Sequence, residues 1–275
     1  MNIFEILEKK SVDPTDEFAR LVALFHFQWK IYNVKYSLKQ IINSEFHKIP
    51  IKLRQTFLSV DDLLRGLNIS EESDYMKDWN ELFLYSELLI NLINYSRIAI
   101  DTNNTAKDTA KQIFSNIKII LEKTNHELVL IKDGYVIVNK NPATTEAIEC
   151  LEEKDSELAL KMIEYNRVLL KGNLDRKREI LASMASFVEP MKTLFNGTNY
   201  SSLYNDSRNM VNNLNIRHNN SGKDALPEYA KNWGNKEYEE WYDNAYHTLL
   251  MVILSKKQLE ITQSFNKLKS FKPEK

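Results

Sequence analysis

Hydrophobic side chains recur at intervals of three and four residues along most of the chain, and this spacing predicts amphipathic helices. The first helix is expected to begin at Asp13-Pro14, where a capping side chain and a proline precede acidic residues in the first turn. Its pattern continues to Ile42 and covers much of the circumference, which favours packing on several sides or a subunit contact. The hydrophobic positions of this helix are Phe18, Leu21, Val22, Leu24, Phe25, Trp29, Ile31, Tyr32, Tyr36, Leu38 and Ile42.

The same spacing predicts further helices in both halves of the chain. Only six glycines and six prolines occur, so we expect few turns and long elements. Pro190 is expected to kink or split one helix, because proline lacks the backbone N–H that the helix needs. The predicted ranges are about 60–66, 79–100 and 105–123, then a helix from 142, and 155–171, 174–195, 200–216 and 236–267.

One stretch, from Glu127 to Asn139, departs from helical spacing and predicts a β-hairpin. Two β-branched runs flank Asp133-Gly134, a preferred two-residue hairpin turn. Because a two-stranded ribbon alone is marginally stable in water, we expect it to lie against helices or to join a partner's strands. The predicted fold class is therefore all-α, a multi-helix bundle with one embedded β-hairpin at about 127–139. We expect an N-terminal helical layer over 1–125, the hairpin at 126–140 and a C-terminal helical bundle over 141–275.

The composition fits a globular protein that can bury a substantial core. Of the 275 residues, 43% are hydrophobic and 27% are charged. A net charge of −1 gives no general attraction for nucleic acid, so an RNA contact would need a local basic patch. The single cysteine, Cys150, excludes an internal disulfide and a multi-cysteine metal site. Since the sequence shows neither a secretory signal nor an apolar run of membrane-spanning length, we expect a cytoplasmic protein without a membrane partner.

The sequence carries no motif for the common cofactors. There is no glycine-rich phosphate loop, no Gly-x-Ser-x-Gly and no His-Glu-x-x-His. The histidines are scattered without the spacing of metal ligands, and we therefore expect neither a metal nor a cofactor. These histidines are His26, His47, His126, His218 and His247.

The densest polar run in the chain extends from Asn212 to Asn220, between two predicted helices. Its asparagines compete with the backbone for hydrogen bonds, so they favour a helix end or a turn. One interpretation is a helix C-terminus, closed by asparagines in left-handed backbone conformation and by the cations Arg217 and His218. The other interpretation is a small active site presented at this helix end.

An Arg-polar pair at the end of the penultimate helix, followed by a loop and a long final helix, resembles the HEPN superfamily. That resemblance rests on Arg217-His218 and extends over about residues 155–265. It implies a compact helical bundle of a kind frequent in bacterial toxin–antitoxin, abortive-infection and other anti-phage systems. Many HEPN proteins are metal-independent RNA endonucleases that act as dimers, with the motif at the subunit contact. The family motif also has a later histidine, and residues 219–225 contain none.

RNA cleavage needs a base for the 2′-hydroxyl proton, a cation for the phosphorane charge and an acid for the leaving oxygen. Arg217 suits the second task, because its permanent charge binds phosphate oxygens through two donors. His218 suits the first or the third, because an imidazole titrates near neutrality. The flanking amides of Asn212, Asn213, Asn219 and Asn220 could orient a phosphate or the ring of His218.

Two further groups could support this chemistry. Asp243 and His247 are four residues apart on the last predicted helix, so they share one side and could form an acid–base pair. A basic cluster around the Gly172 turn could contact phosphate, although a solvated helix junction also explains it. This cluster consists of Arg167, Lys171, Arg176, Lys177 and Arg178.

Two functions therefore remain open. The first is a ribonuclease of anti-phage defence or toxin type, active or catalytically decayed, that works as a homodimer and has RNA, an antitoxin or another defence-system protein as its partner. The second is a helical module without catalytic activity that recognises a protein or a small ligand through the asparagine run. In this second case Arg217 and His218 only cap the preceding helix and pair with acids such as Glu240 or Asp243.

Overall fold

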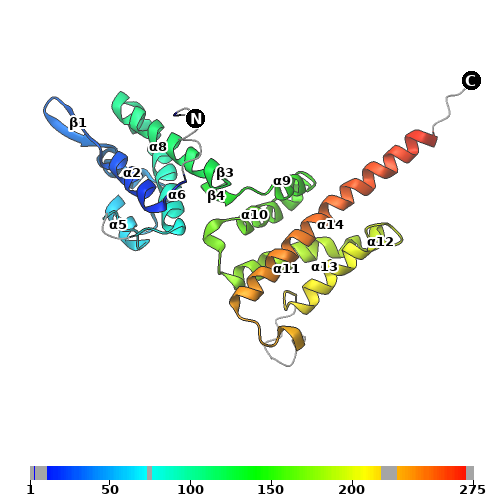
Figure 1. Cartoon of the computed structure of the whole chain (residues 1–275). Helices are drawn as coiled ribbons and strands as arrows, with labels where there is room; N and C mark the ends of the chain where they lie inside the picture. The colour runs from blue at the N-terminus through cyan, green and yellow to red at the C-terminus, as the bar shows by residue number, and fades with distance from the viewer. Residues whose placement is uncertain (1–2, 4–10, 73–75, 218–227, 271–275) are drawn as a thin grey trace, which may run out of the picture. The chain divides into compact units, whose positions relative to one another are not determined.

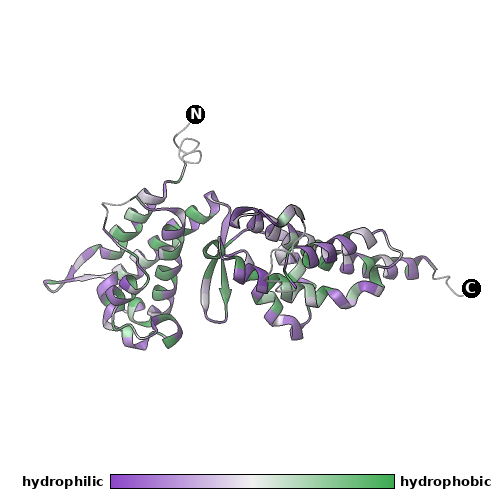
Figure 2. Cartoon of the chain, turned by 90° about the horizontal axis from the view of Figure 1, so that it is seen from below, coloured by the Kyte–Doolittle hydropathy of each residue, from purple (hydrophilic) through white to green (hydrophobic). Residues whose placement is uncertain are grey.

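The computed structural model describes residues 3, 11–72, 76–217 and 228–270 (Figure 1). The chain divides into two compact units, residues 1–140 and 141–275. Helices make up most of both units, and a hairpin is embedded where the sequence predicts one, which confirms the fold class. Hydrophobic and hydrophilic residues alternate along the helices of each unit, as amphipathic packing requires (Figure 2).

The first unit consists of helices with two short hairpins between them. Asp13 caps α2 by accepting a hydrogen bond from the Asp16 amide, as the sequence predicts. Phe18, Leu21 and Phe25 form the buried face of that helix. The elements are α2 (Pro14–His26), β1 (Gln28–Ile31), β2 (Val34–Ser37), α3 (Leu38–Ser44), η1 (Phe46–Lys48), α4 (Ile51–Arg54), α5 (Val60–Gly66), α6 (Trp79–Tyr95), α7 (Arg97–Asp101), α8 (Asn104–Lys123), β3 (His126–Ile131) and β4 (Gly134–Asn139).

The first predicted helix is too long, because α2 ends at His26 and a second hairpin follows. Strands β1 and β2 pair antiparallel around the turn residues Tyr32 and Asn33. Both residues have positive φ, 46° and 66°, which is the backbone of a tight hairpin turn. Aromatic and β-branched residues on both sides favour the extended strands, and this local preference overrides the helical spacing.

The hairpin predicted at 127–139 is present as β3 and β4, and it lies against α6 and α8 of the same unit. Asn91 on α6 holds it through two hydrogen bonds of 2.8 Å with the backbone of Tyr135. The turn is one residue earlier than predicted, because Ile131 pairs with Gly134. Gly134 has a φ of 132°, and a Cβ there would lie 2.3 Å from Oδ1 of Asn91, so glycine is required.

A half-buried carboxylate ties several elements of the first unit together. Glu71 follows α5, and its side chain accepts hydrogen bonds from Lys39 at 2.6 Å, His26 at 2.9 Å and Tyr85 at 2.7 Å. Lys39 also pairs with Asp61 at 2.6 Å. These contacts join α2, α3, α5 and α6 around one acidic group.

The second unit is a bundle of helices packed around α14. Its elements are α9 (Pro142–Glu149), η2 (Glu153–Asp155), α10 (Ser156–Tyr165), η3 (Val168–Leu170), α11 (Leu174–Val188), η4 (Glu189–Met191), α12 (Lys192–Phe195), α13 (Ser201–Asn213), η6 (Glu228–Ala230) and α14 (Asn235–Ser270). As the sequence predicts, Asn141 caps α9 and Pro190 splits one helix into α11 and α12. Helix α10 ends at Tyr165, earlier than predicted, and a short 3-10 turn follows.

Helix α14 contacts α9, α11 and α13, so it is the central element of the second core. Tyr246 on this helix is buried, and its hydroxyl contacts Thr144 at 2.9 Å and Asn166 at 2.8 Å. The ring of Tyr246 stacks on Tyr165 with centroids 4.0 Å apart. This satisfied polar cluster fixes how α9, α10 and α14 lie against one another.

Candidate functional site

Arg217 lies just beyond the C-terminal end of α13. The helix ends at Asn213, and Asn215 adopts a left-handed φ of 58°, as the helix-end interpretation predicts. Leu214 and Ile216 are buried and anchor this end in the core. The side chain of Arg217 is 36% exposed and forms an ion pair with Glu189, at the start of η4. Its partner is therefore neither Glu240 nor Asp243.

The asparagines around Arg217 do not form a single cluster. Asn212 is exposed, whereas Asn213 lines a groove between α13 and α14. His218, Asn219 and Asn220 lie outside the described residues. Among the described residues, the titratable side chain that contacts Arg217 is the carboxylate of Glu189.

Asp243 is occupied by contacts within the core. Its carboxylate accepts hydrogen bonds from Tyr165 at 2.9 Å and Lys177 at 2.7 Å. Burial and this carboxylate both raise the pKa of Tyr165, so the phenol stays protonated and donates. His247, one turn further along α14, is exposed. Asp243 therefore serves to join α10, α11 and α14, rather than to act on His247.

The predicted basic cluster is largely neutralised by acids of the same unit. Arg176 binds both oxygens of Glu164 at 2.7 Å, and Lys177 is buried between Glu239 at 2.9 Å and Asp243. Arg178 pairs with Asp175 at 3.4 Å. Arg167 is half-buried, and Lys171 is exposed. Arg176 and Lys177 thus hold helices together and Arg178 pairs within α11, so these three cations are already matched by acids.

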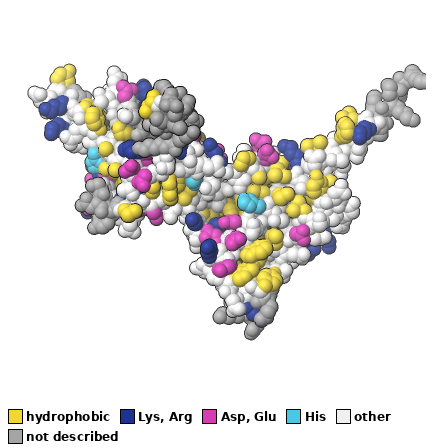
Figure 3. Space-filling view, in the orientation of Figure 1, with side chains coloured by type: hydrophobic (Ala, Val, Ile, Leu, Met, Phe, Trp, Pro, Cys, Tyr) yellow, Lys and Arg dark blue, Asp and Glu magenta, His cyan; other side chains and the backbone are white. Residues whose placement is uncertain are grey.

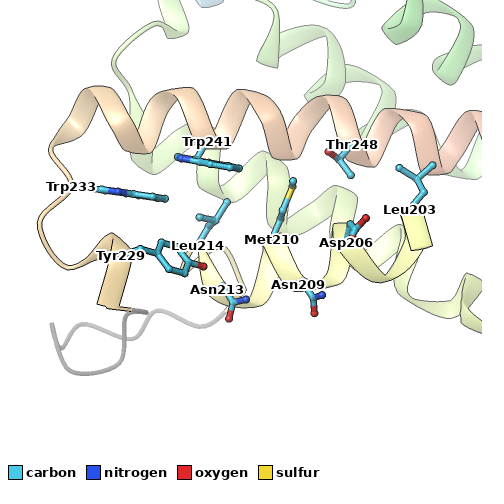
Figure 4. Close-up of a pocket in the computed structure, with 10 residues that line it drawn as sticks. All are labelled: Leu203, Asp206, Asn209, Met210, Asn213, Leu214, Tyr229, Trp233, Trp241 and Thr248. Atoms are coloured by element: carbon cyan, nitrogen blue, oxygen red, sulfur yellow. The ribbon is translucent and has the colours of Figure 1, made fainter. Parts of the chain in front are cut away.

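The structure instead has an open groove between α13 and the first half of α14, which we call the α13/α14 groove. It has a volume of about 520 Å³. Figure 4 shows Met210 and Leu214 extending from α13 towards α14, where Trp241 faces them. The residues that line it are Leu203, Asp206, Asn209, Met210, Asn213, Leu214, Tyr229, Trp233, Trp241 and Thr248.

An aromatic cluster forms one end of the groove. The indoles of Trp233 and Trp241 are nearly parallel, at 3°, with centroids 5.9 Å apart. Tyr229 lies beside Trp233 at 5.7 Å, and Tyr238 meets Trp233 edge-on at 5.4 Å. Trp241 is 39% exposed and Tyr229 is 59% exposed, so large apolar surfaces face solvent here. Figure 3 shows hydrophobic side chains at the surface beside the first turns of α14.

The rim of the groove is polar and its charge is negative. Asp206 points towards α14, while Asn209 and Asn213 point away from it (Figure 4). Among the described residues that line the groove there is one acid and no basic side chain. A concave apolar surface with a few polar groups is the usual form of a ligand-binding site. The charge favours a cationic ligand over a phosphate.

The sequence places Trp241 within the last predicted helix, 236–267, and gives Trp233 and Tyr229 no role. The signal was the density of aromatic residues between Tyr229 and Tyr242, where five occur in 14 residues. Elsewhere in the described residues, no group of three or more His, Cys, Asp or Glu side chains could hold a metal ion. None of the described helices has both the length and the apolar character to cross a membrane.

No protein-family model matches the chain, and no curated protein or solved structure matches it either. The function is therefore inferred from the residues of the chain itself.

Proposed function

We propose that the protein is a helical binding module whose α13/α14 groove takes the apolar face of a basic amphipathic helix from a partner. The observation that carries this proposal is the exposed aromatic groove with an acidic rim. Interface anchors are enriched in tryptophan and tyrosine, and the groove presents both in one place.

The shape of the groove favours a helix as the ligand. Leu203, Met210 and Leu214 recur at helical spacing and form a strip along α13, opposite Trp241 and Thr248 on α14. Two neighbouring helices leave a linear depression between them, and a third helix fits such a depression through residues spaced three and four apart.

The charge of the groove favours a basic ligand. Asp206 lies inside the groove, and Glu237 is one turn before Trp241 on α14, where it is exposed. Lysine or arginine side chains on the flanks of a docked helix would lie near these carboxylates. Such charges mainly set the orientation and the rate of association, while the apolar contacts supply most of the affinity.

A labelled model peptide with leucines at helical spacing and lysines on its opposite face tests this proposal. We expect it to bind the full-length protein and Trp241→Ser to weaken binding at least about 30-fold, the effect of losing about 2 kcal/mol at an interface anchor. Trp79→Ser is the matched control, because Trp79 in the first unit is also 39% exposed. Fluorescence anisotropy measures the affinity.

A second peptide with the same leucine spacing, but with glutamates in place of the lysines, tests whether the charge of the ligand affects binding. We expect wild type to bind the glutamate peptide poorly and Asp206→Lys to reverse the preference. Equal binding of both peptides, or equal losses from Trp241→Ser and Trp79→Ser, would contradict the proposed groove.

A ribonuclease is a second proposal, and one observation favours it: the guanidinium of Arg217 lies at the surface, directly before His218 in the chain. If this proposal holds, wild type cleaves RNA without metal, and the double variant Arg217→Ala/His218→Ala loses cleavage but keeps the helical circular dichroism. Arg208→Ala is the control, because Arg208-Asn209 is a nearby Arg-polar pair on α13. If the wild-type protein leaves RNA intact, the ribonuclease proposal is contradicted and the groove proposal is unaffected.

A further inference from the structure

The end of α14 leaves the bundle, and its side chains are exposed from Glu260 to Lys269. We call residues 254–269 the α14 tail. Figure 1 shows this end of the helix extending beyond the other helices of the second unit. Large hydrophobic side chains nevertheless occur on it: Ile261 is 52% exposed, Phe265 54% and Leu268 73%.

These residues form one continuous stripe. Met251, Leu254, Ile261, Phe265 and Leu268 follow the three- and four-residue spacing of a coiled-coil seam, with Gln258 at the remaining position. A stripe of this kind on a solvated helix marks a surface that another element covers. Figure 3 shows hydrophobic side chains beside a basic one near this end of the helix.

The two halves of α14 carry opposite charge. Residues 235–248 contain one lysine and four acidic residues, whereas residues 249–270 contain four lysines and one glutamate. The α14 tail is therefore a basic amphipathic helix, the ligand that the acidic α13/α14 groove fits. Two copies of α14 in antiparallel orientation would place the basic half of each beside the acidic half of the other.

The helix dipole explains only part of this charge distribution. A dipole acts on charges in the first and last turns. Asp243 lies beyond the first turn, and Lys256 and Lys257 lie several turns before the end of the helix at Ser270. Lys177 pairs with both Asp243 and Glu239, so the acids of this half of α14 outside that cluster are Glu237 and Glu240, and Asp206 lies across the groove.

We infer that the partner of the groove is a second copy of this chain, and that two copies exchange their α14 tails, each tail lying in the α13/α14 groove of the other. This inference rests on the proposed function of the groove. The exchange is symmetric and closed, because each copy offers one tail and one groove. Tail residues such as Phe265 then meet the exposed face of Trp241 in the partner.

The lengths of the two surfaces agree. At 1.5 Å per residue, the groove strip from Leu203 to Leu214 is about 16.5 Å long and the exposed tail from Glu260 to Lys269 is about 13.5 Å long. A tail cannot reach the groove of its own chain. Trp241 and Phe265 belong to one helix without glycine or proline, and they are about 36 Å apart along its axis.

Disulfide cross-linking between two differently labelled chains tests the exchange. Both chains carry Cys150→Ser, which removes the single native cysteine. One chain carries Met210→Cys in the groove, and the other carries Phe265→Cys in the tail. We expect mild oxidation to give a mixed disulfide between them. The control replaces Met210→Cys by Ile119→Cys, a position in the first unit that is 52% exposed, and should give none.

Sedimentation velocity of the full-length protein supplies the second measurement. We expect a dimer for wild type and a dissociation constant raised at least about 30-fold by Ile261→Asp/Phe265→Asp, with unchanged circular dichroism because both positions are exposed. The leucine–lysine peptide should compete with dimer formation. The monomeric double variant should still bind this peptide, because its groove is intact.

The outcomes separate the inference from the proposed function. A wild type that stays monomeric at micromolar concentration and gives no mixed disulfide, yet binds the peptide through Trp241, overturns tail exchange and leaves the groove proposal standing. A disulfide that forms only between two Phe265→Cys chains also overturns it, since the tails would then pair with each other. If the peptide does not bind the monomeric variant, both tail exchange and the groove proposal are contradicted.

Discussion

Two lysines of one predicted phosphate cluster show how burial changes the role of a cation. Lys177 is 6% exposed, and its ammonium lies 2.9 Å from Glu239, 2.7 Å from Asp243 and 5.2 Å from the centroid of the Tyr165 ring. Lys171 is exposed at the neighbouring turn. The first therefore joins α11 to α14, and the second is available to solvent.

Lys177→Ala should lower the free energy of unfolding by about 1.5–3 kcal/mol, because it removes hydrogen bonds to two carboxylates. Lys171→Ala should change it by no more than about 0.5 kcal/mol, as is usual for a solvated position. Urea unfolding followed by circular dichroism measures both. Equal effects of the two substitutions would show that the contacts of Lys177 contribute nothing.

The sequence predicted which residues at the end of α13 are polar, but not what they contact. Asn215 closes the helix in left-handed conformation, as asparagine chemistry leads one to expect. The partner of Arg217 is Glu189, which is 28 residues earlier in the chain. Spacing along a helix carries no information about contacts over such a separation. The predicted pairing of Arg217 with Asp243 or Glu240 rested only on the final helix being the next one in the chain.

At the scale of elements, the first unit depends on one carboxylate that four helices approach. Burial alone would raise the pKa of Glu71, but hydrogen bonds from Lys39, Tyr85 and His26 outweigh it and lower the pKa below its usual 4.5. Burial would likewise lower the pKa of Lys39, and its bonds to Asp61 and Glu71 raise it instead. The ionised network is thus favoured in the folded state.

A carboxylate with a lowered folded-state pKa stabilises the protein above its unfolded pKa and loses this effect as the pH falls. We therefore expect the contribution of Glu71 to be complete above about pH 4.5 and to disappear as the pH drops through its folded pKa. Glu71→Gln should destabilise the protein at pH 7 by about 1.5–3 kcal/mol and flatten the acid limb of the profile. Chemical unfolding across pH 3–7 measures this, with exposed Glu72→Gln as the control. An acid limb that is unchanged by Glu71→Gln would contradict the assignment.

The two hairpins show where the sequence pattern predicts strands correctly and where it does not. The β3/β4 pair is clear from sequence because β-branched runs flank Asp133-Gly134, although the turn itself lies one residue earlier. The β1/β2 pair is hidden, because its aromatic residues also fit a helical stripe and Tyr32-Asn33 is not a common turn sequence. Its Lys30 and Lys35 stand directly opposite each other, which is an unfavourable cross-strand pair that gives no strand signal.

At the scale of the whole molecule, the chain divides into two compact units, residues 1–140 and 141–275. The second core runs from Ala147 on α9 to Ile253 on α14 and includes residues of α10, α11 and α13. The second unit therefore has a hydrophobic core built from its own helices.

A chain of residues 141–275 should fold alone, with helical circular dichroism, a cooperative thermal transition and the peptide affinity of the full-length protein. The matched control is the same fragment with Trp241→Ser, which should fold and lose binding. A fragment that is unfolded, or that needs residues 1–140 for binding, would contradict the independence of the second unit.

The groove could be only partly predicted from sequence. The helices on both sides of it follow from hydrophobic spacing, since α13 and α14 are near their expected bounds. The cavity itself depends on how Trp233, which precedes α14, turns back to stack on Trp241. This return is a tertiary contact, and no periodicity along the chain specifies it.

Helix α14 has 36 residues, and at 1.5 Å per residue it is a rod of about 54 Å. Its middle is held inside the second unit by the hydrogen bonds of Tyr246, while the side chains from Glu260 to Lys269 are exposed. Because backbone hydrogen bonds join each turn of the helix to the next, a torque on the exposed end is transmitted to the part that is buried in the bundle. A molecule that binds the end of α14 therefore acts on the interior of the bundle through the helix itself, with no loop between them.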